Sequence, residues 1–185
     1  MKIPLILDLD TLRAINQNDG LAELSRVGFI WDVKHYRQGR LLDHEVVHNL
    51  MPTEGLNYLL DTSVRGVAQL TSWYIGLFEG NYTPVLADTA ATFPASATES
   101  TAYAEAARQA FTVVAAAGGV LTNTAAPATF TANASKTWYG GFISSASAKS
   151  ATTGKLLSAA QFSTAKAVAN TDQLVVTASI TLTSS

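Results

Sequence analysis

Short runs in which apolar and polar residues alternate, each closed by a turn signal, limit most strongly what this chain can fold into. The clearest run is QLVVTASITLTSS (173–185), where every second residue from Leu174 to Leu182 is apolar or small and most intervening positions are Thr, Ser or Val. Side chains on a strand point alternately to opposite faces of the sheet. The run therefore predicts a strand with one buried face.

Other runs share this character. They are RVGFIWDVKHY (26–36), LTSWYIGLFEG (70–80), ATFTANAS (128–135) and KTWYGGFISSAS (136–147), where Gly140-Gly141 indicates a bulge or a close backbone approach. Turn signals stand at Gly80-Asn81, Gly118-Gly119, 133–135, Thr153-Gly154 and 170–172. Short strands punctuated in this way predict a mainly β fold, an antiparallel β-sandwich that is jelly-roll-like.

The stretch STAYAEAARQAFTVVAAA (100–117) permits two interpretations. Its alanines favour a helix, whereas Phe111, Val113 and the GGVLTNTA that follows suit a hairpin. We expect a strand in its second half.

One short helix is expected at about 52–65. Pro52 suits a first helical turn, Glu54 complements the positive helix end, and an apolar stripe from Leu56 to Val64 precedes Gly66. At 185 residues the chain is long enough for one sizeable core. We therefore expect an N-terminal arm over 1–25 and a single β-sandwich domain over 26–185 that includes the helix.

Charge and composition exclude several classes of function. Twelve basic and fourteen acidic side chains give no broad electrostatic footprint, so neither nucleic acid nor a membrane is an expected partner. The absence of cysteine excludes disulfides, thiolate metal sites and cysteine nucleophiles. The first twenty residues lack the long apolar stretch of a signal peptide, so we expect no cleaved signal.

The string HEVVH at 44–48 raises the question of a zinc protease. On a helix, His44 and His48 share a face and bind one Zn²⁺, while Glu45 polarises the attacking water. Pro52 follows too closely for such a helix to continue, and Met51 stands where the long form of the motif has glycine.

An extended backbone explains the same segment. Alternation runs through 41–50, so the segment equally forms a strand that pairs with 26–36, and its two histidines then stand about 13 Å apart. We therefore predict no metal-binding residues and no cofactor, and keep a zinc metalloprotease as a remote alternative.

Other constellations give no catalytic residues. The serines near Asp172 and the histidines form no G-x-S-x-G elbow, and the Gly-Gly pairs lack the lysine of a phosphate loop. The carboxylate pair Asp8 and Asp10 falls in the expected arm, where a solvated surface explains it better than acid/base catalysis does. The aromatics Trp31, Trp73, Tyr74, Trp138 and Tyr139 suit a sugar site, but core or subunit contacts explain them better. We expect the protein not to be an enzyme.

Several segments follow one another in a fixed order over residues 46–185. They are HNLMPTEGLNYLLD, the stretch from TSWYIGLFEGNYTP to RQAFT, and then NTAAPATF, TTGKLL and DQLVVTASITLT. In this succession the sequence resembles virion proteins of tailed bacteriophages. The sequence is similar in particular to the cement or decoration proteins on the outside of the capsid.

This resemblance implies a jelly-roll-like sandwich, homo-oligomers (dimers or trimers), and binding to the major capsid protein on the outer capsid surface. It supplies no catalytic motif. The leading hypothesis is thus a capsid cement protein that stabilises the shell. The alternative is a receptor- or glycan-binding module of a phage tail fibre, because the same architecture serves there.

Overall fold

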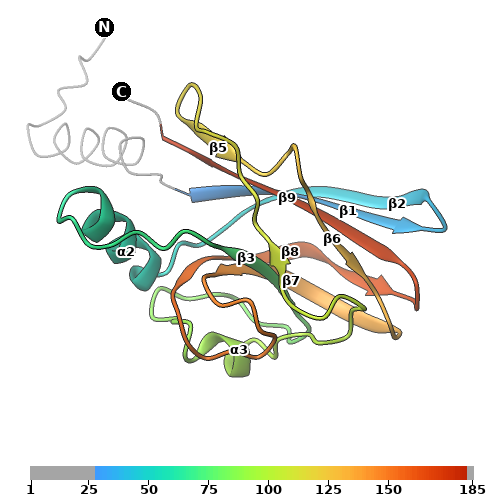
Figure 1. Cartoon of the computed structure of the whole chain (residues 1–185). Coiled ribbons are helices and arrows are strands. Elements are labelled where there is room, and N and C mark those ends of the chain that lie inside the picture. The colour runs from blue at the N-terminus through green and yellow to red at the C-terminus, as the bar shows by residue number, and fades with distance from the viewer. Residues whose placement is uncertain (1–27, 183–185) are drawn as a thin grey trace, which may run out of the picture.

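The computed structural model describes residues 28–182, and Figure 1 shows two antiparallel sheets packed face to face. The mainly β sandwich predicted from the alternating runs is confirmed. The expected arm over 1–25 lies outside the described residues. No helix within residues 28–182 is long and apolar enough to cross a membrane.

The first sheet has the order β2-β1-β9-β5, and β6 also pairs with β9. Its strands are β1 (Gly28–Arg37), β2 (Arg40–His48), β5 (Val120–Thr122), β6 (Ala128–Thr131) and β9 (Gln173–Thr181). A two-residue turn joins β1 to β2, with positive φ at both Gln38 (50°) and Gly39 (76°). That conformation matches the twist of a hairpin and favours glycine.

The second sheet has the order β4-β3-β7-β8. Its strands are β3 (Tyr74–Phe78), β4 (Gln109–Ala110), β7 (Lys136–Ser144) and β8 (Leu156–Val168). The register of β7 against β8 shifts between Trp138 and Gly140, which is the predicted bulge. A Cβ on Gly140 would lie 2.2 Å from the Ala160 carbonyl oxygen, so the backbones also approach closely there.

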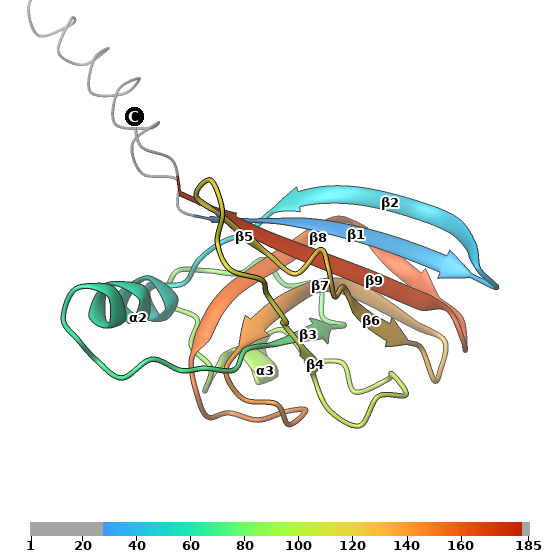
Figure 2. The ribbon, with the colours of Figure 1, turned by 45° about the horizontal axis from the view of Figure 1, so that its top comes forward.

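The helix expected at about 52–65 is α2 (Thr53–Ser63), and a second, one-turn helix is α3 (Phe93–Ser96). Gly55 and Tyr58 are buried on α2, which packs on the start of β8. Figures 1 and 2 place α2 at the end of the sandwich where the described chain enters at β1 and leaves at β9.

The core lies between the sheets and follows the predicted alternation. On β9 the residues Leu174, Val176 and Ala178 are fully buried, and on the neighbouring strand β1 the buried residues Phe29, Trp31 and Val33 lie beside them on the same inner face of the sheet. A smaller cluster around Phe93 lies under α3. Burial of these aromatic and branched side chains is the main force that holds the two sheets together.

Two expectations about single elements need correction. The predicted strand in the second half of 100–117 reduces to the two residues of β4, because the backbone of 111–116 runs without ladder pairing and is exposed from Thr112 onward. The long strand β8 is not among the predicted runs. Its LLSAAQFSTAKAV is rich in alanine and carries little intrinsic strand signal.

Candidate functional site

The HEVVH segment lies on strand β2, paired with β1 as the alternation predicted. His44 and His48 are exposed, and His44 Nε2 lies 3.2 Å from Asp32 Oδ2 on the neighbouring strand. Glu45 points to the opposite face of the sheet, toward β8. Within residues 28–182, no group of three or more His, Cys, Asp or Glu residues is arranged to hold a metal ion. The helical zinc arrangement is therefore not formed.

The aromatic side chains considered for a sugar site belong mainly to the core. Trp31 and Trp138 are fully buried, and their indole nitrogens donate to Ser158 Oγ (3.3 Å) and Ser100 Oγ (2.9 Å). Trp73 is half-buried and packs edge-on against Tyr58. The core interpretation is confirmed for the two buried indoles, which cannot stack on a ligand.

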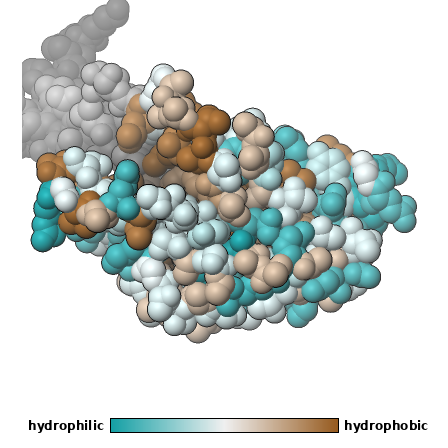
Figure 3. Space-filling model, in the orientation of Figure 1, coloured by the Kyte–Doolittle hydropathy of each residue, from teal (hydrophilic) through white to brown (hydrophobic). Residues whose placement is uncertain are grey.

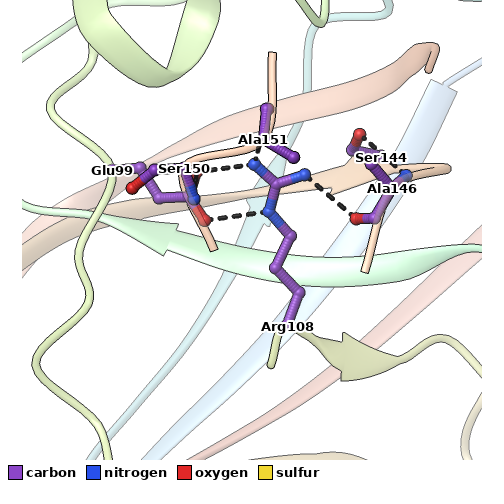
Figure 4. A network of polar contacts seen from close by, with 6 residues as sticks. All are labelled: Glu99, Arg108, Ser144, Ala146, Ser150 and Ala151. Carbon is purple, nitrogen blue, oxygen red and sulfur yellow. Dashed lines mark hydrogen bonds and ion pairs between the residues drawn. The ribbon is translucent and has the colours of Figure 1, made fainter. Parts of the chain in front are cut away.

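Arg108 and Glu99 form a fully buried ion pair at the foot of the second sheet (Figure 4). Arg108 Nε and Nη2 donate to the Glu99 carboxylate at 2.8 and 2.6 Å, and further donors reach the carbonyls of Ala146 and Ala151. The Ser150 N–H donates to Glu99 Oε2 at 3.0 Å. Both Glu99 oxygens accept hydrogen bonds, and the pair holds the loop after β7 through Ala146, Ser150 and Ala151, so its role is structural.

Asp172 is the centre of a second buried cluster. Arg37 Nε and Nη2 donate to its two oxygens at 2.8 and 2.7 Å, the Ala169 N–H donates at 2.8 Å, and His35 Nε2 lies 2.9 Å away. The Arg37 hydrogen bonds hold the pKa of Asp172 well below its usual range, against the opposing effect of burial. The cluster clamps the β8–β9 turn onto the end of β1.

Lys166 on β8 is the third buried charge, with a side chain only 1% exposed. Its ammonium contacts Asp43 Oδ2 and lies 3.0 Å from Glu45 Oε1, both on β2. Glu45 Oε2 accepts from the Thr164 N–H at 3.2 Å. The cluster thus joins the two sheets where both end in an edge strand.

Sequence reasoning missed all three clusters. Arg108 lies 9 residues from Glu99 along the chain, Asp172 lies 137 residues from His35, and Lys166 lies 123 residues from Asp43. One signal was available: Lys166 is the single charge of the alanine-rich stretch 156–168, and Arg108 shares the alanine-rich stretch 100–117 with Glu105 alone. A lone charge in such a stretch indicates a buried, paired group as readily as an exposed one.

The two ends of the sandwich differ in surface chemistry. At the end where the described chain enters and leaves, exposed apolar residues lie on α2, in the segment just after it, and near β5. Figure 3 shows brown, hydrophobic surface over both regions. The residues are Leu60, Val64, Val67, Leu70, Val113, Val114 and Leu182.

The opposite end carries the β1–β2, β6–β7 and β8–β9 turns, which are mostly polar in Figure 3. We call residues 37–42, the β1–β2 turn with its flanks, the tip. It presents Arg37, Gln38 and Arg40 beside Leu41 and Leu42, which are 46% and 44% exposed. Exposed cationic and apolar side chains that lie together on a clamped turn suit recognition of another molecule.

Comparison with protein families gives a match over most of the described chain. The family model described as podophage GP4 fiber I protein gp80 matches residues 51–183, from the last residues before α2 to just beyond β9. Neither the curated proteins nor the solved structures gave a match. A match over this length covers α2, α3 and every strand except β1 and β2. The chain therefore belongs to the family of the podophage GP4 fiber I protein gp80, and is a phage virion structural protein.

Proposed function

We propose that the protein is a non-enzymatic module of a phage tail fibre that presents the tip to a receptor on the host surface. The observation that carries the proposal is the fibre family's match across 51–183. It favours the tail-fibre alternative over the capsid cement hypothesis, which rested on resemblance alone.

The arrangement of the sandwich supports a module with an attached end and a free end. Gly28 pairs with Thr181, so the chain enters and leaves the described fold at neighbouring positions. Apolar surface surrounds that end, and apolar surface of this kind buries well against a neighbouring subunit. The tip lies at the far end of β1, where it is available for recognition.

Contacts between one module and a receptor are small in area, and many copies compensate for this. Linked copies convert weak contacts into high avidity without any new chemistry. We therefore propose a homo-oligomer on the virion. No reaction is needed for this role.

The proposal is tested by competition for adsorption. The full chain, displayed in many copies on beads, is expected to reduce phage adsorption to its host. Replacing Arg40 and Leu42 by alanine is expected to weaken this competition about tenfold, since few contacts dominate such interfaces. The matched control is Leu60→Ala, which removes an exposed leucine at the opposite end.

Two results would contradict the proposal. One is that the variant in which Arg40 and Leu42 are replaced by alanine reduces phage adsorption as strongly as the unchanged protein does. The other is binding of the full chain to empty capsid shells with a rise in their rupture temperature, which supports the capsid cement hypothesis instead.

A further inference from the structure

The two edge strands β2 and β8 lie next to each other on one side of the sandwich, as Figure 2 shows. Leu50, just after β2, exchanges backbone hydrogen bonds with Ala159 of β8 at 2.9 and 3.0 Å. This exchange fixes the strands relative to each other. The Lys166 side chain fills the space between them and meets both inward-facing carboxylates of β2.

The environment of Lys166 is unusual for a structural ion pair. Lysine is almost never fully buried unless it is paired, and here one Nζ lies between two carboxylates, those of Asp43 and Glu45. Within the described part of the chain, Glu45 Oε1 is buried and makes no hydrogen bond of suitable angle, although it lies 3.0 Å from Nζ. The Arg108–Glu99 pair, in contrast, leaves no carboxylate oxygen unsatisfied.

We propose that Lys166 and Asp43 become joined by an intramolecular isopeptide bond, with Glu45 as the group that transfers the proton. This inference stands on the geometry of the chain and does not depend on the proposed function. It goes beyond the fibre role by assigning a covalent modification to the fold.

The reaction requires no external reagent. The Lys166 hydrogen bond lowers the pKa of Asp43, so the pair begins as ammonium and carboxylate. Glu45 takes one proton from Nζ and passes it to the Asp43 carboxylate, which leaves a neutral amine and a carboxylic acid. The amine attacks Cγ of Asp43 and a new C–N bond forms. One C–O bond then breaks, and the leaving hydroxyl takes a second proton from the nitrogen and departs as water. An ammonium and a carboxylate become one amide and one water, and Glu45 is regenerated.

Position lowers the barrier that makes such a condensation slow in water. Groups held in reactive contact react as if each were present at an effective concentration of about 10⁵–10⁸ M. The nitrogen is shielded from solvent, whereas the Asp43 side chain is 43% exposed and gives the released water a way out. Thr164 N–H holds Glu45 in place through its other oxygen.

The bond would close the open side of the sandwich. It links β2 of the first sheet to β8 of the second and encloses residues 43–166 in a covalent loop. Tension on the ends of the described chain acts on β1 and β9, which lie outside this loop. A fibre module built this way keeps residues 43–166 covalently tethered, with β2 attached to the second sheet, when those two strands are pulled away.

Mass spectrometry of the denatured full chain tests the proposal directly. The wild-type protein is expected to lack one water, about 18 Da, and its tryptic digest is expected to contain a branched peptide that joins Asp43 to Lys166. The variants Lys166→Arg and Glu45→Gln are expected to keep their full sequence mass.

Two further variants act as controls. Asp43→Asn is expected to lose ammonia, about 17 Da, because the side-chain amide of asparagine releases ammonia where the aspartate releases water. Lys34→Arg is expected to retain the loss of water, since the Lys34–Asp32 pair is exposed on the outer face of the sheet. A wild-type chain that keeps its full mass overturns the inference, and so does a loss of water that persists in Lys166→Arg.

Discussion

Single buried charges determine how the loops of this protein are held. Arg108, Asp172 and Lys166 are each buried, and each is paired with an oppositely charged side chain. A buried charge is tolerated when its partners satisfy it, and removing one partner leaves the other uncompensated. These residues are therefore the most sensitive positions for stability outside the apolar core.

Arg108→Ala is expected to lower the free energy of unfolding by about 3–5 kcal/mol, because Glu99 is left buried without a counter-charge. Urea unfolding measures this change. The control is Lys155→Ala, which breaks an exposed pair with Glu54 and is expected to cost less than about 1 kcal/mol. Equal losses in both variants would contradict the role given to the buried pair.

Asp172 makes stability depend on pH in the acid range. Its pKa is lowered in the folded protein, so its contribution is present above its unfolded pKa of about 3.9 and is lost as pH falls below that value. In Arg37→Ala the pKa of Asp172 is expected to rise toward the usual range and this acid dependence to shrink. Urea midpoints of both proteins between pH 6 and pH 2 measure the difference, and identical slopes would rule out the clamp.

At the scale of elements, the sequence pattern predicted strands that have one buried and one exposed face. It did not predict strands that form only because a neighbouring strand pairs with them. Alternation predicted β1, β2 and β9, and the sequence around Pro52 predicted α2. The alanine-rich strand β8 exists because β7 and β2 pair with it or pack on it, which no local signal reveals. The Asp172 and Lys166 clusters were hidden for a similar reason, because the first forms when β1 pairs with β9 and the second forms when β2 and β8 of the two sheets pack.

Close packing of α2 on β8 depends on Gly55. A Cβ at this position would lie 2.6 Å from the Leu157 carbonyl oxygen, so helix and strand must separate to admit it. Gly55→Ala is expected to lower the free energy of unfolding by about 1–3 kcal/mol despite the better helix propensity of alanine. Asn57→Ala, at an exposed position of the same helix, is expected to be neutral or slightly stabilising. A stabilised Gly55→Ala protein in thermal unfolding would contradict this packing.

At the scale of the whole molecule, the sandwich has one apolar end where the chain enters and leaves and one polar end formed by clamped turns. The first suits attachment to other virion proteins and the second suits recognition. Rigid turns favour binding because little conformational entropy is lost when a partner docks. The Asp172 cluster beneath the tip supplies such rigidity.

The location of the protein on the intact virion tests the central claim most directly. Gold-labelled antibodies raised against the full chain, viewed by electron microscopy, are expected to mark the tail fibres. Regular labelling over the surface of the head, with bare fibres, would contradict the account and support a capsid cement protein.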